Sequence, residues 1–127
     1  MKIAISSKGK TKDSLLDVRF GRCEYFQIYD TENEKINVVK NNGQVTEGGA
    51  GIAAAQQLID RKVDVIITGN LGPNAFGLID KANIKAYKCK SVSIDEALAQ
   101  YNNGGLLELK EAGPAHHGAD NGFGGGR

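Results

Sequence analysis

The chain has 127 residues, with 16 Lys and Arg against 15 Asp and Glu, which gives a formal net charge of +1. This length predicts one domain with its own core, and the balanced charge argues against a dedicated nucleic-acid binder, which usually carries a basic excess. No apolar run approaches the roughly 18 residues of a membrane span, and the apolar stretch after Lys2 is too short for a signal peptide, so we expect a cytoplasmic protein.

The first half of the chain predicts three strands. Residues 2–6 form a short apolar run typical of a buried strand, and residues 24–30 are rich in aromatic side chains. Residues 31–34 indicate a hairpin turn, after which residues 35–40 alternate polar and apolar side chains as a third strand. The polar segment 7–22 is a long loop for so small a domain, and such loops are usually functional or mobile.

The second half alternates helices and strands. Apolar side chains at helical spacing predict a helix over about residues 50–61, and residues 63–68 predict a buried strand of the parallel type. Pro73 marks the start of a second helix, and residues 84–88 form a fifth strand. The sequence from Ser93 to Glu96 is a capping box, which opens a third helix.

This order of elements predicts an α/β fold with three layers and a ribonuclease-H-like motif. The two strand–helix–strand units require right-handed crossovers between parallel strands. We therefore expect a mixed five-stranded sheet of order 3-2-1-4-5, in which strand 2 is antiparallel. Residues 1–110 form this domain, and residues 111–127 have no periodic apolar face, which predicts a flexible tail containing glycine and histidine.

The predicted topology brings the unusual segments of the chain to one edge of the sheet. The parallel strands all end there, and open α/β sheets bind their ligands outside the carboxyl ends of the strands. The glycine turns at residues 48–51 and 69–74 each open a helix, where free N–H groups and the helix dipole favour an anion. The candidate anion-binding residues are Arg19, Arg22, Gly48, Gly49, Gly51, Gly69, Asn70, Gly72 and Asn74. The alternative is that these glycines only serve tight turns and close helix–sheet packing.

Four side chains are candidate metal ligands. Cys23 and Cys89 suit iron–sulfur, copper or zinc chemistry as thiolates, and inert buried cysteines are the alternative. Three strand steps separate them, roughly 14 Å at about 4.8 Å per step, which disfavours a disulfide but allows both to contact one large cluster. Two thiolates do not complete a four-cysteine site. His116 and His117 could capture a metal from the tail, and a passive solvated tail is the alternative.

Together and in this order, the motifs resemble the dinitrogenase iron–molybdenum cofactor biosynthesis family, which includes NifX-like proteins and a domain at the end of some NifB proteins. The matching stretches, within about residues 1–110, are 2–5, 19–30, 49–54 and 69–76. The resemblance implies a ribonuclease-H-like fold that binds an anionic metal–sulfur cluster, iron–sulfur or molybdenum-containing, without turnover. Many relatives have His where this chain has Arg19, and a guanidinium can hold an anion but does not coordinate a metal. The resemblance therefore leaves Cys23, four residues on, as the candidate ligand.

The favoured function is thus a small carrier or scaffold for a metal–sulfur cluster, with cofactor-assembly or iron–sulfur proteins as partners. We expect no nucleic-acid or membrane partner, and a monomer or weak homodimer. A nuclease of the ribonuclease-H type is disfavoured, because its two metal ions need clustered carboxylates. The first strand carries no acid, and Asp64 lies near the start of the fourth strand, at the wrong edge. A nucleotide- or phosphate-binding regulatory module and a protein–protein adaptor remain as alternatives.

Overall fold

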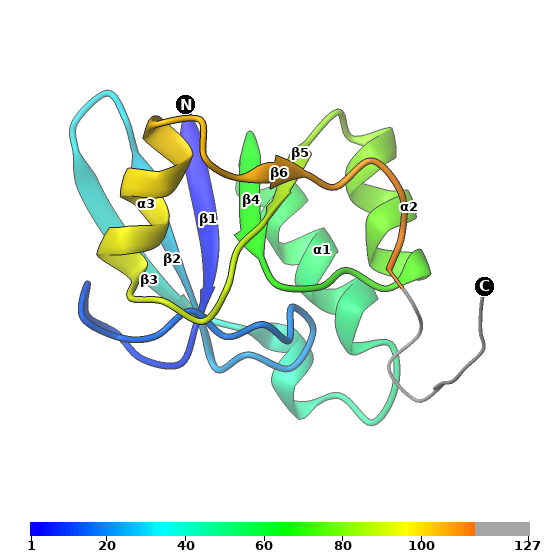
Figure 1. The fold of residues 1–127 in the computed structure, drawn as a ribbon. Helices are drawn as coiled ribbons and strands as arrows, with labels where there is room; N and C mark the ends of the chain where they lie inside the picture. Colours follow the sequence, from blue (N-terminus) through cyan, green and yellow to red (C-terminus); the bar gives the residue numbers. More distant parts are fainter. Residues whose placement is uncertain (114–127) are drawn as a thin grey trace.

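The computed structural model describes residues 1–113, so His116 and His117 lie outside the described residues. Its elements alternate along the chain much as the residue pattern predicts (Figure 1). They are β1 (Lys2–Ser7), β2 (Tyr25–Asp30), β3 (Lys35–Lys40), the 3-10 helix η1 (Asn42–Val45), α1 (Ala50–Asp60), β4 (Val65–Thr68), α2 (Pro73–Lys81), β5 (Lys85–Lys88), α3 (Ile94–Asn102) and β6 (Leu107–Glu108). Within this described part, no helix is both long and apolar enough to cross a membrane.

The strands form one mixed sheet of order β3-β2-β1-β4-β5-β6. β2 is antiparallel to both β1 and β3, whereas β1, β4 and β5 are mutually parallel. The predicted order 3-2-1-4-5 and the antiparallel second strand are therefore confirmed. The ribonuclease-H-like assignment itself stays a prediction.

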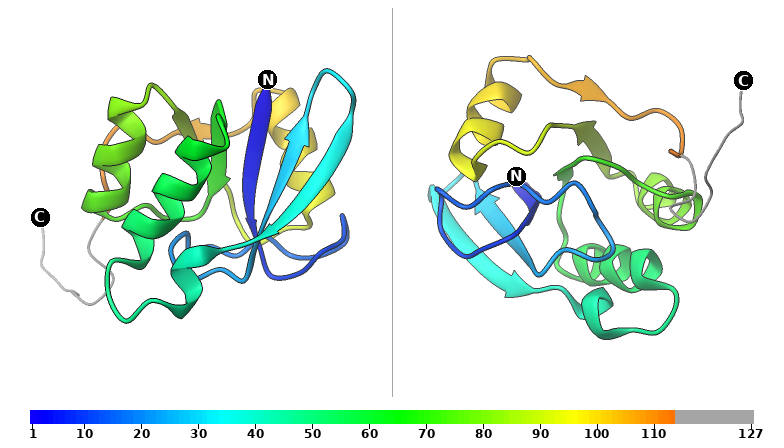
Figure 2. Two further views of the ribbon diagram at one scale, coloured as in Figure 1. Left: turned by 180° about the vertical axis from the view of Figure 1, so that it is seen from behind. Right: turned by 60° about the horizontal axis from the view of Figure 1, so that its bottom comes forward.

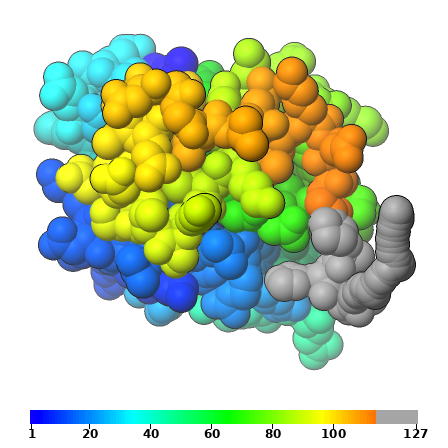
Figure 3. Space-filling view, in the orientation of Figure 1, coloured from blue at the N-terminus to red at the C-terminus, as the bar shows by residue number. Residues whose placement is uncertain are grey.

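The predicted count of five strands is wrong, because β6 adds a sixth, antiparallel to β5. β6 has only two residues, both exposed, and Leu107 has 79% of its surface accessible. After a turn at Gly104, which has a positive φ of 73°, the segment runs antiparallel beside β5, and the Leu109 N–H donates to the Ala86 carbonyl at 2.8 Å. The orange segment that contains β6 lies on the surface (Figure 3). Its pairing with β5 is made by backbone groups, so no alternation of side chains predicts it.

Helices cover both faces of the sheet and make three layers (Figures 1 and 2). Successive side chains of a strand point to opposite faces, so Ala4 and Ile66 pack under α1 and α2, whereas Ile5 and Ile67 pack under α3. β1 and β4 are buried on both faces, which explains their continuous apolar runs.

The long loop between β1 and β2 is closely attached to the domain. Leu16 is fully buried, and its N–H donates to the Val92 carbonyl at 2.8 Å. Further along, Arg19 forms a parallel bridge with Asn70, the second residue after β4. These contacts hold the end of the loop beside the start of α2.

Candidate functional site

A cleft of about 330 Å³ lies where the loop after β1 meets the first turns of α1 and α2. All three segments lie on the lower side of the domain in Figure 1. The cleft is lined by Arg19, Phe20, Gly21, Arg22, Gly49, Ala50, Gly51, Ile52, Asn70, Gly72, Pro73, Asn74 and Ala75. The volume is at the lower end of the range for small-ligand sites. The cleft therefore contains all of the predicted anion-binding residues except Gly48 and Gly69.

Both helices that open into the cleft begin without a capping side chain. Gly49 is the N-cap of α1 and Gly72 is the N-cap of α2, and neither helix has an acidic residue in its first turn. The remote helix α3 differs, because the Ser93 hydroxyl accepts from the Glu96 N–H at 3.1 Å and two acidic residues follow. The first N–H groups of a helix have no partner within it. At α1 and α2 these N–H groups place partial positive charge at the cleft.

The glycines of the two turns serve different purposes. A Cβ added at Gly69 would collide with Val18, and one added at Gly51 would lie 3.3 Å from the Ala75 Cβ, so these two allow close packing. Gly49 has a positive φ of 68°, which favours glycine. Gly72 has an ordinary backbone conformation, and a Cβ there would meet nothing within 4 Å. Packing thus accounts for Gly69 and Gly51, whereas Gly72 leaves open space in front of the α2 amides.

Arg19 is held against the cleft wall by Asp17, a residue that the sequence analysis missed. The Asp17 Oδ1 accepts from the Arg19 backbone N–H at 2.9 Å and from its Nε at 3.1 Å, and Oδ2 accepts from Nη2 at 2.9 Å. Burial raises the pKa of Asp17, but the hydrogen bonds and charge of Arg19, with the charge of Lys8, outweigh burial and lower the pKa below its usual value. The pair is therefore ionised at neutral pH.

Arg22 binds backbone carbonyls of the neighbouring loop. Its Nη1 donates to Thr46 O at 2.7 Å and, over longer distances, to Gly43 O and Gln44 O. A guanidinium at this position supplies further donors to the carbonyls at the end of η1, where Gly43 O also accepts from the Thr46 N–H at 3.2 Å. Arg22 thus shapes the loop that leads to α1 while its positive charge remains at the cleft.

Asn41 is a second residue that the sequence analysis missed, and it connects two loops next to the cleft. Its side chain is 4% exposed. The amide Nδ2 donates to Gly21 O at 3.0 Å and to Cys23 O at 2.9 Å, and Oδ1 accepts from the Gly43 N–H at 2.8 Å. An Asn just after a strand and two residues before a glycine is a usual turn signal, but its partners 18 and 20 residues earlier leave no local pattern.

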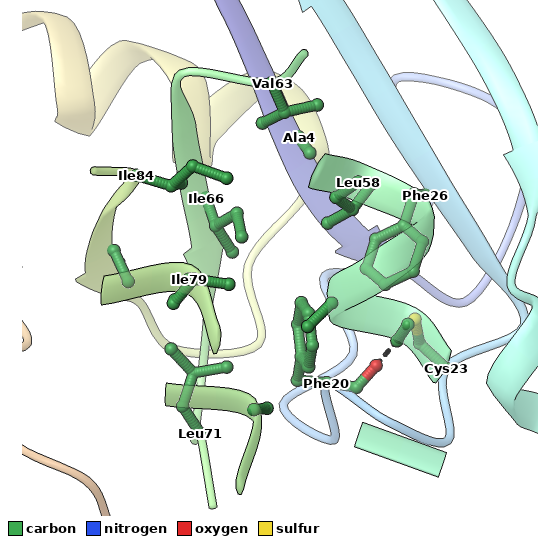
Figure 4. Close-up of a cluster of buried hydrophobic side chains, with 14 of the residues drawn as sticks. Ala4, Phe20, Cys23, Phe26, Leu58, Val63, Ile66, Leu71, Ile79 and Ile84 are labelled. Atoms are coloured by element: carbon green, nitrogen blue, oxygen red, sulfur yellow. Dashed lines mark hydrogen bonds between the residues drawn. The ribbon is translucent and has the colours of Figure 1, made fainter. Parts of the chain in front are cut away.

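Neither cysteine lines the cleft, and the two lie in different cores on opposite faces of the sheet. Cys23 is fully buried beside Phe20 and Phe26 (Figure 4), and its Sγ donates to Phe20 O at 3.4 Å. Burial raises the pKa of Cys23 to about 12. Burial also raises the pKa of Cys89, whose Sγ lies 3.9 Å from Gln100 Oε1. The structure does not bring the two thiols together, and metal ligation by either of them stays a prediction.

Over residues 1–113, no three His, Cys, Asp or Glu side chains gather closely enough to hold a metal ion. The lining of the cleft contains no acidic side chain. What it offers is N–H donors, from the backbone, two guanidinium groups and two side-chain amides. Donors of this kind bind the outer acceptor atoms of an anion.

Cys23 is expected to resist alkylation in the folded protein. A thiol with a pKa of about 12 has so little thiolate at pH 8 that its reaction should be about 1,000-fold slower than in the unfolded chain. Iodoacetamide labelling with peptide mapping, with and without urea, measures this ratio. Rapid native labelling of Cys23 would show that the thiol is exposed and contradict the prediction.

The chain is similar in sequence and in structure to several known proteins. Residues 1–104 match the family model described as dinitrogenase iron–molybdenum cofactor. The chain is 32% identical to an uncharacterized protein of Methanocaldococcus jannaschii, over 87% of this chain and 92% of the relative. It is similar to the apo form of the orange protein from Desulfovibrio gigas, with a TM-score of 0.82 and 31% identity over 87% of this chain and 93% of the other. A putative NifB protein from Thermotoga gives a TM-score of 0.75 and 36% identity, over 85% and 92% of the two chains.

Proposed function

The chain belongs to the dinitrogenase iron–molybdenum cofactor family, and from this membership we propose that its cleft carries an anionic metal–sulfur cluster for cofactor assembly or delivery. The protein would act as a cytoplasmic carrier or scaffold and not as an enzyme. Cofactor-assembly or iron–sulfur proteins would supply and receive the cluster. The cargo would be an iron–sulfur cluster or a molybdenum-containing sulfide cluster.

The observation that carries this proposal is the convergence of two uncapped helix N-termini on one cleft without acidic side chains. The bridging and terminal sulfides of a metal–sulfur cluster are negatively charged acceptors. N–H groups of the first turns of α1 and α2 would donate to them, Arg19 would add further N–H donors, and Arg22 would add positive charge. Such a site holds a cluster whose metal ions already have their ligands, because the lining has no thiolate, imidazole or carboxylate to coordinate a bare metal.

Hydrolysis of the ribonuclease-H type finds no support in this cleft, since that chemistry needs paired carboxylates for two metal ions. Asp64 is at the opposite end of the sheet, where its Oδ2 accepts from the Lys2 N–H at 2.8 Å. A phosphate-binding module would use the same N–H donors, so inorganic phosphate serves as a competitor in the experiment below.

The test is anaerobic reconstitution with iron, molybdate, copper and sulfide, followed by metal and acid-labile sulfide analysis and a visible spectrum. We expect stoichiometric metal and sulfide with a charge-transfer spectrum, weakened by phosphate only at high concentration. The Cys23→Ala and Cys89→Ala variants are expected to keep the cluster if N–H donors hold it. Loss of the cluster in either variant would instead support the thiolate ligation predicted from the sequence. Wild-type protein that stays colourless and metal-free would contradict the proposed function.

A further inference from the structure

Asp17 makes a bidentate ion pair with Arg19 although the two side chains differ greatly in exposure. The Asp17 carboxylate is 2% exposed, whereas the Arg19 side chain is 53% exposed and lines the cleft. Two oxygens of the carboxylate receive the Nε and Nη2 groups, at 3.1 and 2.9 Å. This pairing holds the plane of the guanidinium in one orientation, because both bonds must be kept at once.

The backbone of Asp17 is hydrogen-bonded to the sheet through both its N–H and its carbonyl. The Asp17 N–H donates to the Ser6 carbonyl at 2.9 Å, and the Ser6 hydroxyl donates to the Asp17 carbonyl at 2.6 Å. The same hydroxyl lies 2.7 Å from the Thr68 hydroxyl, at the end of β4. The position of Asp17 is therefore determined by the carboxyl ends of the two central strands.

A guanidinium has five N–H groups, and the pairing uses two of those on Arg19, one on Nε and one on Nη2. The three others, two on Nη1 and one on Nη2, remain for a ligand. The charges of the two residues also offset each other, so the pair contributes directed donors to the cleft more than it contributes net charge. A flexible arginine would have to lose its side-chain freedom when the anion binds.

From this arrangement we infer that Asp17 is a positioning residue for anion binding: it fixes the Arg19 guanidinium at the cleft wall with three N–H groups left for the acceptor atoms of the ligand. The inference rests on the proposed function, because it assigns Arg19 to the same anion. This inference and an argument from net charge alone predict opposite changes in anion affinity for one variant. Removing the negative charge of Asp17 should strengthen anion binding if net charge dominates, and should weaken it if orientation dominates.

The experiment titrates the folded protein with tetrathiomolybdate, a coloured molybdenum–sulfide dianion, and follows the visible difference spectrum at fixed ionic strength. The Asp17→Asn variant is expected to bind about fivefold more weakly than wild type, since one flexible side chain is no longer preorganised. Glu47→Gln is the matched control, because Glu47 is exposed in the loop just before Gly48 and carries the same charge. It should bind as tightly as wild type, or more tightly.

One further variant keeps the test independent of the folding of Asp17→Asn, and one double variant tests whether Asp17 acts through Arg19. Arg19→Lys preserves the charge at an exposed side chain and loses the two-point pairing, so it should also weaken binding about fivefold. In an Arg19→Gln background, Asp17→Asn should cost nothing more, because Asp17 acts through Arg19. Asp17→Asn binding that equals or exceeds wild type, or an Arg19→Lys variant that binds normally, would overturn the inference. Failure of the wild type to bind would overturn the proposed function itself.

Discussion

Replacing Gly72 by aspartate is expected to stabilise the fold and to lower the affinity for an anionic cluster by at least about 100-fold. Gly72 is the N-cap of α2 in an ordinary backbone conformation, and the space around its missing side chain is open. A carboxylate there would accept from the first free N–H groups of α2, as N-cap aspartates do. It would therefore occupy, with its own negative charge, the donors that the ligand needs.

The substitution should raise the free energy of unfolding and lower the anion affinity, and the two changes can be measured separately. Capping and the helix dipole together should add about 0.5–1 kcal/mol to the free energy of unfolding. A unit charge about 4 Å from another like charge costs roughly 4 kcal/mol at an effective dielectric constant of 20, more than enough for a 100-fold loss of affinity. Urea unfolding measures the first quantity, and tetrathiomolybdate titration measures the second.

Gly72→Asn is the matched control, because it caps the same helix without adding charge. It should stabilise the fold similarly and lose much less affinity than Gly72→Asp. Equal affinities of Gly72→Asp and wild type would show that the α2 N-terminus is not part of the binding site. A less stable Gly72→Asp variant would show that the open space in front of α2 is not available to a side chain.

Replacing Asn41 by aspartate is expected to destabilise the protein by about 3 kcal/mol at neutral pH. The substitution keeps the shape of the side chain but replaces an N–H donor by an oxygen, opposite the carbonyls of Gly21 and Cys23. The new carboxylate would be buried, since the Asn41 side chain is 4% exposed. The Gly43 N–H would still donate to Oδ1, but the second carboxylate oxygen would face only acceptors, which leaves the buried charge incompletely compensated.

The loss of stability in this variant should depend on pH in a defined direction. Burial and the facing carbonyls raise the folded-state pKa of the introduced carboxyl above its unfolded value of about 3.9. The protonated form regains an O–H donor, so the variant is closest to wild type below that unfolded pKa. Its deficit grows as pH rises toward the folded pKa and is constant above it.

Urea unfolding of the variant and of the wild type, at several pH values from about 3.5 to about 8, measures this deficit. Asn42→Asp is the control, because Asn42 is exposed and its side chain makes no hydrogen bond within residues 1–113, whereas its backbone N–H donates to Gln57 Oε1 at 2.8 Å. It should change stability by no more than about 0.5 kcal/mol. A deficit of the Asn41→Asp variant that is equally small would contradict the role of Asn41 in joining the two loops.

The location of the cleft could be predicted because it depends on strand order alone. Parallel strands end at one edge, so the turns that follow them must meet there. The residues that make the cleft selective could not be predicted in the same way. Gly69 and Gly72 look alike in the sequence. In the structure, Val18 packs against Gly69 and leaves no room for a side chain there, whereas the space around Gly72 is open.

The surroundings of the two cysteines could not be predicted from the sequence either. Spacing along the chain and the strand order place Cys23 and Cys89 far apart, but they do not reveal that each thiol belongs to a different core. Burial depends on which segments cover the side chain in the folded protein, and Cys23 is covered in part by the aromatic pair Phe20, from the loop after β1, and Phe26, from β2. The high pKa of the Cys23 thiol follows from that tertiary burial.

Apolar periodicity in the sequence predicts the main elements, their order and the edge at which the helix N-termini meet, because it records which face of each element is buried. The tertiary fold adds the two-residue strand β6, the pairing of Asp17 with Arg19 at the cleft wall and the hydrogen bonds of Asn41. β6 is held by backbone hydrogen bonds, which any sequence can make. The polar contacts depend on where loops cross in space, and a short loop segment has no periodicity from which that crossing can be inferred.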